Sequence, residues 1–311
     1  MDSEALDTFL AVHRRGGVSA AASALSRTQS AISRRLALLE REVGTALFER
    51  VGRRLVLSEV GAALLPYAER IAAVLGDART TVEAAKSGTA GTLRMVTVGT
   101  LANASLAQAL RRVKATFPEL DLRLQTATSA EVSAKVRAGE ATVGLRYFED
   151  HSSDLDCRVV QHERLVVTCS PGHRLAGKRV KSLDRLVDER WLAFPVQERR
   201  RESFAATIFA QFLTRGIDQI DWIAIDGLTA QKRLVEAGFG LALLQAGAID
   251  DELARRELAV IRIDDLDATV PVARVVRRRS YLSGGTQALL KELERWGGGH
   301  SRAGRLRPPS S

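Results

Sequence analysis

Five polar residues near the start of one stretch, residues 28–43, have the chemistry to recognise the edges of nucleic-acid bases. They are Thr28, Gln29, Ser30, Ser33 and Arg34. Apolar residues from Ile32 to Val43 recur in the same stretch at intervals of four, three and four, which predicts the buried stripe of a helix. A glutamine amide can pair with adenine through two hydrogen bonds, and an arginine can pair with guanine in the same way. The pattern therefore predicts a helix whose exposed end reads base edges; a solvated face of a small helical bundle is the alternative.

The elements before this helix are suited to holding it in a groove of a duplex. A helix is expected around Leu6–His13, and Gly16 and Gly17 end it. Ser19 is expected to N-cap a short helix from Ala20 to Leu25, whose alanines allow close packing, and Thr28 to N-cap the helix at 29–43. Two helices joined by the short break at 26–28 predict a helix-turn-helix, in which the second helix enters the major groove.

A basic hairpin is predicted directly after the second helix. Leu47 and Phe48 are expected core anchors, and Arg50, Arg53 and Arg54 precede the β-branched run "LVL". This pattern predicts a two-stranded wing whose arginines contact phosphates or the minor groove. The net charge is +9, and residues 13–56 hold nine arginines against three glutamates, so the excess charge is concentrated where a polyanion would bind.

These residues resemble a known family. Leu6, Phe9 and Val12, followed by "SAAASALSRTQSAISR" (19–34), "LEREVGTALFERVGRR" (39–54) and "LSEVG" (57–61), resemble the DNA-binding domain of LysR-type transcriptional regulators. The resemblance implies a winged helix-turn-helix domain at residues 1–58. It also implies DNA-binding roles for Ser19, Thr28, Gln29, Ser30, Ser33, Arg34, Arg50, Arg53 and Arg54.

A long helix is predicted to follow at residues 59–88, N-capped by Ser58. Its small and apolar residues alternate spacings of four and three, which is the heptad pattern of a helix that pairs with a copy of itself. The predicted dimerisation residues are Leu64, Ala68, Ile71, Leu75, Ala78 and Val82. The alternative is a long helix packed on its own domain.

Residues 89–298 alternate strand-like and helical segments, which predicts an α/β domain with a mainly parallel sheet. The segments "GTLRMVTVGT" (91–100), "FPELDLRL" (117–124) and "VEAGFGLALL" (235–244) resemble the two-lobe effector domain of the same regulators, which is akin to periplasmic binding proteins. We expect lobe I at about 91–162 and 266–298, lobe II at about 163–265, and a basic, disordered tail at 299–311. Thr142 and Gln245 depart from the family, which often has aspartate and proline there.

An effector is expected between the lobes, at the carboxyl ends of strands where helix N-termini offer free amide donors. Arg146 or one of Arg199, Arg200 and Arg201 is expected to supply a cation, which favours a small organic acid as effector. The predicted effector-binding residues are Thr100, Leu101, Thr126, Thr128, Ser129, Arg146, Phe194, Pro195, Val196, Gly227 and Thr229.

Other functions have less support. "GHRLAGKR" (172–179) has Arg179 where a phosphate-binding loop needs serine or threonine, and "GFGLAL" (238–243) lacks a third glycine. The five histidines form no metal-ligand spacing, and no nucleophile or acid–base pair stands out, so we expect no metal, no cofactor and no enzyme activity. Cys157 and Cys169 leave open a redox-responsive regulator, or a constitutive one, without a small-molecule effector.

The predicted protein is a bacterial, sequence-specific transcriptional regulator whose DNA binding or activation a small molecule modulates. Its expected partners are double-stranded DNA with an inverted repeat, the effector, further copies in a homodimer or homotetramer, and RNA polymerase. No run of apolar residues is long enough to span a membrane, and the N-terminus lacks the basic segment of a signal peptide, so we expect a cytoplasmic protein.

Overall fold

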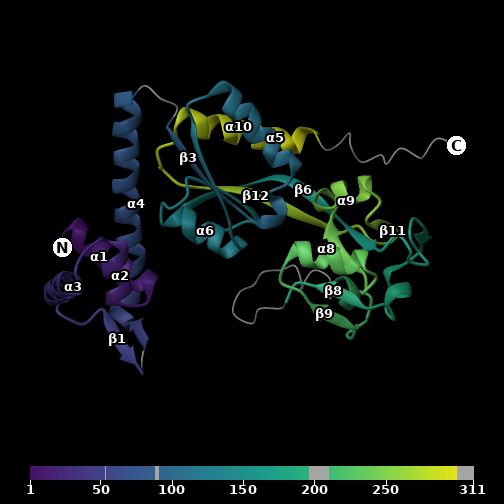
Figure 1. The fold of residues 1–311 in the computed structure, drawn as a ribbon, viewed down its shortest axis with the longest axis horizontal. Coiled ribbons are helices and arrows are strands. Elements are labelled where there is room, and N and C mark those ends of the chain that lie inside the picture. The colour runs from purple at the N-terminus through teal and green to yellow at the C-terminus, as the bar shows by residue number, and fades with distance from the viewer. Residues whose placement is uncertain (53, 88–90, 196–209, 300–311) are drawn as a thin grey trace.

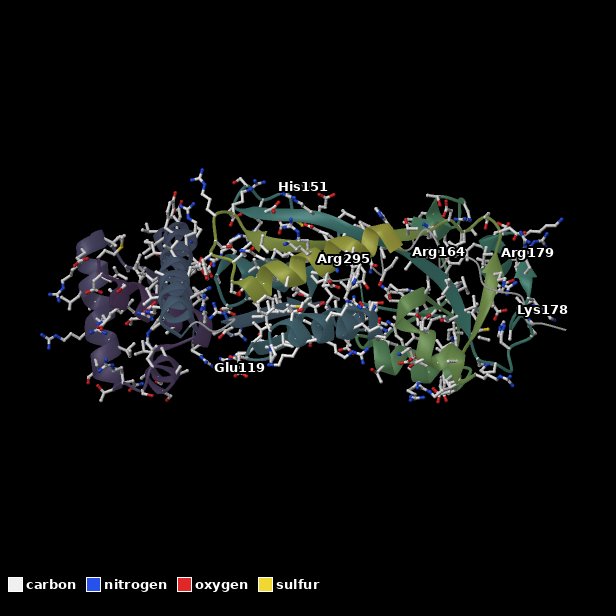
Figure 2. The ribbon with its side chains drawn as sticks, turned by 90° about the horizontal axis from the view of Figure 1, so that it is seen from above. Glu119, His151, Arg164, Lys178, Arg179 and Arg295 are labelled. Carbon is white, nitrogen blue, oxygen red and sulfur yellow. The ribbon has the colours of Figure 1, made fainter. Side chains whose placement is uncertain are left out.

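The structure is a computed structural model that describes residues 1–52, 54–87, 91–195 and 210–299. A helical head, one long helix and a two-lobe domain follow one another along the longest axis of the molecule (Figures 1 and 2). The chain therefore has the predicted architecture, a winged helix-turn-helix with a linker helix followed by two α/β lobes.

The head consists of α1 (Ser3–Arg15), α2 (Val18–Ala24) and α3 (Gln29–Val43) around one apolar core. Ile32, Leu36 and Leu39 of α3 are buried in this core, as their spacing predicts. Thr28 caps α3 by accepting a hydrogen bond from the backbone N–H of Ala31 at 3.2 Å, as expected. Ser19 does not cap α2: the N-cap is Gly17, and Ser19 lies inside the first turn. That prediction was wrong because the extended backbone of Gly17 starts the helix two residues early.

A two-stranded wing, β1 (Phe48–Val51) and β2 (Arg54–Leu57), closes the head. Three contacts connect the wing and the loop before it to the neighbouring helices. The Leu47 N–H donates to the Glu40 carboxylate at 2.8 Å, and the Ser58 hydroxyl donates to the Ala46 carbonyl at 2.8 Å. At Gly61, a Cβ would overlap the carbonyl oxygen of Leu47 and lie 3.0 Å from its carbon, so only glycine fits.

The linker helix α4 (Glu59–Ser87) begins beside the wing, where the Ser58 hydroxyl accepts the Gly61 N–H at 3.0 Å. Two of its predicted dimerisation residues are placed differently from the expectation. Ala68 is fully buried and Leu64 half-buried against the core of the head, so both pack within their own chain. The heptad pattern could not separate this contact from a dimer seam, because both need apolar residues at helical spacing. Ile71, Leu75, Ala78 and Val82 are exposed and do not belong to the core of the head.

Lobe I contains three parallel strands in the order β4 (Asp121–Thr126), β3 (Thr92–Thr97) and β5 (Val143–Tyr147). The connecting helices are α5 (Ala104–Thr116) and α6 (Ser129–Arg137), and α10 (Gly284–Gly299) packs beside α5. Alternating helix and strand in the sequence thus produces the parallel part of the sheet, as predicted.

Two long strands, β6 (Leu155–Cys169) and β12 (Thr269–Arg277), pass between the lobes and pair antiparallel with each other. The prediction of a mainly parallel sheet was therefore wrong at its centre, because one strand carries the chain into lobe II and the other carries it back. Their pairing shifts register between Val272 and Ala273, which face Gln161 and Val159, so Val160 is an extra residue on β6.

Lobe II packs around the far half of β6. Its strands are β7 (Arg179–Val180), β8 (Trp191–Ala193), β9 (Trp222–Ala224), β10 (Ala242–Gln245) and β11 (Ala259–Ile263). Its helices are α8 (Leu228–Glu236) and α9 (Asp250–Ala254). Both β10 and β11 pair antiparallel with β6, whereas β8 and β9 form a separate parallel pair.

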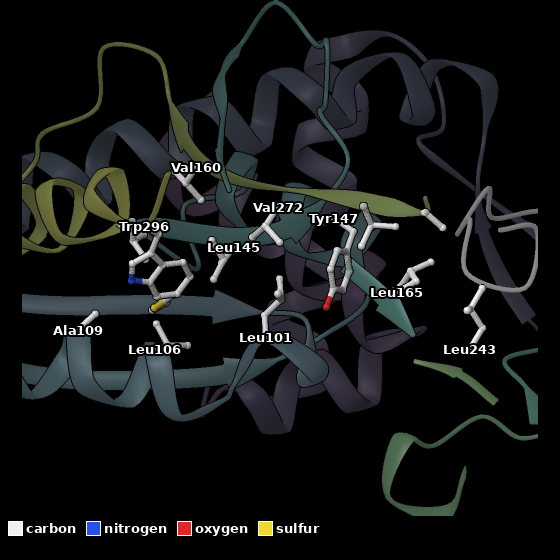
Figure 3. Packing of buried hydrophobic residues seen from close by; sticks show 14 of the residues in the cluster. Leu101, Leu106, Ala109, Leu145, Tyr147, Val160, Leu165, Leu243, Val272 and Trp296 are labelled. Carbon is white, nitrogen blue, oxygen red and sulfur yellow. The ribbon is translucent and has the colours of Figure 1, made fainter. Parts of the chain in front are cut away.

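One apolar core runs through both lobes along the crossing strands. Figure 3 shows Leu145, Tyr147 and Val272 of lobe I in line with Leu165 and Leu243 of lobe II. The crossing strands therefore join the two lobes through buried side chains as well as through the backbone. Among the described residues, no helix combines the length and the apolar character that crossing a membrane requires.

The contact at Gly61 predicts a sharp difference between two glycines of α4. Gly61→Ala should lower the free energy of unfolding by about 1–3 kcal/mol, because the new methyl group must displace the Leu47 carbonyl. Gly76→Ala is the matched control: nothing lies within 4 Å of a Cβ there, so alanine should stabilise the helix by up to about 1 kcal/mol. Thermal unfolding of both variants measures the effect, and equal midpoints would contradict it.

Candidate functional site

The start of α3 presents an exposed polar surface. Thr28, Gln29, Ser30, Ser33 and Arg34 are all exposed, on the side opposite the buried stripe. Ser19 belongs to the same surface, because the Gln29 amide N–H donates to its hydroxyl across the turn between α2 and α3. This bond holds the glutamine side chain at the helix start, and its amide oxygen makes no hydrogen bond with another described residue.

Adjacent arginines of α3 have different roles. Arg34 is exposed and makes no hydrogen bond or ion pair with another described residue. Arg35 instead lies 2.6 Å from the Glu4 carboxylate and so connects α3 to α1. Of these two arginines, Arg34 is therefore the one available to a partner.

The wing adds positive charge beside α3. Arg50 and Arg54 are exposed and, within the described residues, have no acidic partner. Arg53 lies outside the described residues. Arg27, in the turn between α2 and α3, is exposed in the same way. Arg27 was not among the predicted residues, although a basic residue in the turn was the available signal.

A second candidate site is a cavity of about 540 Å³ between the lobes. It is lined by Val98, Gly99, Thr100, Thr126, Ala127, Thr128, Glu131, Phe194, Pro195, Asp226, Gly227, Leu228 and Thr229. The lining comes from the carboxyl ends of β3 and β4 in lobe I and of β8 and β9 in lobe II. Strand direction therefore brings together segments that are far apart in the sequence, as expected for parallel α/β units.

Seven of the predicted effector-binding residues line this cavity, namely Thr100, Thr126, Thr128, Phe194, Pro195, Gly227 and Thr229. Thr128 also caps α6 in a capping box with Glu131, whose carboxylate accepts the Thr128 N–H at 3.0 Å. Gly227 is the N-cap of α8 and offers no side chain, so the first-turn amides of α8 are left to bond to water or a ligand.

Thr100 connects the cavity to a buried polar chain. The Thr100 and Tyr147 hydroxyl oxygens are 2.8 Å apart, and the Tyr147 hydroxyl donates to the Glu163 carboxylate at 3.1 Å. Burial, and then the nearby Glu163 charge, raise the pKa of Tyr147 far above its ordinary value, so the phenol stays neutral. The Thr100 hydrogen is then directed at Tyr147, and its oxygen can accept a bond from a ligand.

Three predicted effector-binding residues lie elsewhere. Leu101 is fully buried in the core, and Ser129 is buried where its hydroxyl accepts the Tyr147 N–H at 3.3 Å. Arg146 bonds to the Ser133 hydroxyl at 2.6 Å and to Asp150 at 2.9 Å, away from the cavity lining. These three residues do not line the cavity, because sequence spacing does not show which side of a strand end faces it. Val196 and Arg199–Arg201 lie outside the described residues.

Two acidic residues of the lining, Glu131 and Asp226, were missed. The signals were present: "TSAE" at 128–131 matches a capping box, and Asp226 directly precedes the glycine at which α8 starts. Among the described lining residues they are the charged ones, so the cavity differs from the arginine-bearing cleft that we expected.

Comparison with known proteins places the chain in a family. A family model described as "Bacterial regulatory helix-turn-helix protein, lysR family" matches residues 3–62, and one described as "LysR substrate binding domain" matches residues 86–297. The chain belongs to the LysR family of transcriptional regulators. The head of this LysR-type regulator corresponds to the first match and its two lobes to the second.

Individual relatives match this chain over most of its length and most of theirs. The RuBisCO operon transcriptional regulator of Allochromatium vinosum is 27% identical over 281 residues, which cover 89% of this LysR-type regulator and 90% of the relative. The crystal structure of CbnR, a LysR family transcriptional regulator, has a TM-score of 0.66 at 25% identity and covers 96% of this chain and 99% of CbnR. A full-length OxyR variant from Pseudomonas aeruginosa has a TM-score of 0.69 at 18% identity, covers 95% of this chain and 94% of OxyR, and shows the fold alone.

The Arg146 contacts of this LysR-type regulator predict a pH effect on stability. Burial alone would raise the pKa of Asp150, but bonds from Ser133 and Ser152 and the Arg146 charge outweigh it and lower that pKa to about 2. The ionised carboxylate therefore stabilises the fold above the unfolded pKa of 3.8, and this contribution is lost as the pH falls towards 2.

Asp150→Asn should cost about 1 kcal/mol or less at pH 7, after allowance for solvent screening. It should also reduce the fall in unfolding midpoint between pH 5 and pH 3. Thermal unfolding across this pH range measures both. A variant as acid-sensitive as the unsubstituted protein would show that Asp150 has no such role.

Proposed function

We propose that this LysR-type transcriptional regulator recognises a specific DNA sequence through α3 and responds to a small organic acid bound between its lobes. The observation that carries the proposal is the lined cavity at the strand ends, in a chain whose head leaves a polar, cation-bearing helix start exposed. We place its action in the cytoplasm, together with bacterial DNA, and expect RNA polymerase as a further partner.

For DNA recognition, we assign base reading to Gln29 and Arg34 and phosphate contacts to Arg50, Arg53 and Arg54. The described residues among them are exposed, and none is bound to an acidic side chain. They are therefore available to contact DNA. Ser19, Thr28, Ser30 and Ser33 complete the polar surface. A solved structure of full-length CbnR in complex with its target DNA, at 25% identity and a TM-score of 0.65, supports a DNA-bound state of the same architecture.

The recognition helix of one chain reads only a few base pairs, so we propose a homodimer or homotetramer on an inverted repeat. The far side of α4 supports this. Tyr67, Ile71 and Val74 are 57%, 39% and 63% exposed, and Leu75 and Val82 continue the same side. An apolar stripe of this length on a helix is suited to pairing with a second copy.

The chemistry of the cavity supports an acid that also carries a hydroxyl or amino group. The uncapped first turn of α8 offers amide donors to a carboxylate, and Thr229 adds a hydroxyl there. Thr100 and Asp226 are suited to accept bonds from donor groups of the same ligand. Phe194, Pro195 and Leu228 provide apolar walls.

The geometry of the cysteines disfavours the redox alternative. Cys157 and Cys169 lie on the same strand, β6, twelve residues apart, which in extended backbone is about 40 Å. Burial raises the pKa of both thiols, that of Cys169 to about 11, so little thiolate forms at neutral pH. A disulfide between them would require β6 to break.

For mechanism, we propose that the effector changes how the lobes close and thereby how the bound dimers are arranged on the promoter. The two arrangements must bind the effector with different affinity, since otherwise the effector cannot shift the equilibrium between them. The sign of the transcriptional response then depends on which arrangement the effector favours.

The DNA assignments predict different losses for two kinds of residue. With a duplex that the unsubstituted protein selects from a random pool, Gln29→Ala should lower specific affinity by about ten- to a hundredfold and leave binding to random duplex unchanged. Arg50→Ala should weaken both and lower the salt slope by about one unit, because it removes one phosphate contact. The same is expected for Arg53→Ala.

Arg41→Ala is the matched control, since Arg41 lies in the last turn of α3 and bonds to the Ala37 carbonyl. Its affinity should remain close to that of the unsubstituted protein. Titrations by fluorescence anisotropy at several salt concentrations measure all of these quantities. If Gln29→Ala and Arg50→Ala behaved alike, the division between base and phosphate readers would be wrong.

The effector assignment is tested by thermal shift of the full chain against hydroxy acids, amino acids, simple carboxylic acids, sugars and aromatic alcohols. A ligand at a hundred times its Kd should stabilise the protein by about 2.7 kcal/mol. Thr229→Val should remove the shift, whereas Thr116→Val, whose hydroxyl bonds to the Arg112 carbonyl, should keep it. Shifts from sugars or alcohols alone would exclude the acid, and a shift equal in both variants would place the ligand elsewhere.

A further inference from the structure

One side of the linker helix packs against lobe I of its own chain. Glu69, Ala73 and Asp77 are spaced four residues apart, so they lie on one side of α4. The exposed residues Ile71 and Leu75 lie on the opposite side of the helical turn. Figure 1 shows α4 standing beside lobe I, with α6 lying between α4 and lobe II. The helix therefore has one side for its own effector domain and another for a partner.

An ion pair fixes the position of α4 on lobe I. One guanidinium nitrogen of Arg277 donates to both carboxylate oxygens of Asp77, at 2.7 and 2.9 Å. The two side chains are 11% and 19% exposed, so water screens the pair weakly. Arg277 is the last residue of β12, the strand that crosses from lobe II into lobe I. The last side chain of the crossing strand β12 thus bonds to the linker helix.

A close contact lies one turn away on α4. Gly139, which follows α6, has a φ of +72°, and a Cβ there would lie 2.9 Å from the Ala73 Cβ and 3.0 Å from its Cα. Glycine therefore allows the end of α6 to touch the backbone of α4. The next residue, Glu140, pairs at 3.0 Å with Arg14 in the last turn of α1, so the head itself is in contact.

The other end of α6 lies at the cavity. Thr128 and Glu131 line it, and the 9 residues of α6 span about 14 Å at the rise of a helix. Val132 and Val136 are fully buried against the sheet, and a Cβ at Gly144 would lie 2.6 and 3.0 Å from them, so the helix sits tightly. A helix packed in this way moves as one body.

We propose that α6 couples the cavity to the DNA-binding head through a seat made of Ala73, Asp77, Gly139 and Arg277. A change in how lobe II closes on Thr128 and Glu131 moves α6, and the seat passes this movement to α4 and the head. The inference rests on the proposed function, because it takes the cavity as the effector site, and it adds the path by which that site acts. Coupling is reciprocal, so DNA held by the head must alter the cavity end of α6.

This reciprocity allows a test without the effector. Backbone hydrogen exchange of residues 127–137 is measured in the full chain with and without the selected duplex. DNA should change the exchange rate by about fivefold or more in the unsubstituted protein. Asp77→Arg and Arg277→Asp should each remove the change, and the double variant with the charges exchanged should restore it. The double variant keeps the test valid if a single variant is unstable.

Arg112→Asp is the matched control, because it breaks an ion pair of lobe I, with Glu292 at 2.5 Å, that does not involve α4. In this variant, DNA should still change the hydrogen exchange of residues 127–137. Persistence of the change in both seat variants, or its absence in the unsubstituted protein with DNA bound, would overturn the coupling and leave DNA recognition intact. Failure to select any duplex would instead overturn the proposed DNA recognition and, with it, the coupling.

Discussion

The antiparallel pairing of β6 with β12 is the constraint on which the effector domain depends. These strands join the lobes by a long antiparallel ladder, from Thr269 opposite Arg164 to Arg277 opposite Leu155, with one register shift between Val272 and Ala273. The pairing holds the ends of β3 and β4 in front of those of β8 and β9, which creates the cavity. It also carries Arg277 to the linker helix. Cavity, core and contact with α4 therefore share one structural origin.

The head has a small core, and close backbone contacts and hydrogen bonds around one loop add to its rigidity. Gly61 allows the start of α4 to lie against the Leu47 carbonyl, and Glu40 and Ser58 bond to the same loop. Wing, recognition helix and linker helix are thus fixed to one another around the loop at Ala46 and Leu47. A small domain gains rigidity in this way with little buried area, which suits a module that must present α3 at a defined angle.

Patterns local in sequence predicted the parts of this structure that local physics decides. The buried stripe of α3, the Thr28 cap and the threonines at the strand ends follow from helical period, capping chemistry and strand direction. Residues whose role depends on a distant partner could not be predicted. Arg34 and Arg35 are adjacent, but only Arg35 faces Glu4, and Arg146 is bound by Asp150 rather than directed at the cavity. Leu64 and Ala68 fit a dimer seam equally well until the head is folded against them.

The extra residue Val160 has a consequence for how one strand can belong to two lobes. Side chains alternate along a strand, so a one-residue offset exchanges its two sides. Before the offset, Leu155 faces the smaller cluster beneath α6; after it, Leu165, Val167 and Cys169, again odd-numbered, face the main core instead. On β12, which has no extra residue, the even-numbered Val270, Val272 and Val276 keep to the main core throughout. A single inserted residue thus changes the parity of β6 between the lobes, and it allows two differently built halves to share one uninterrupted interior.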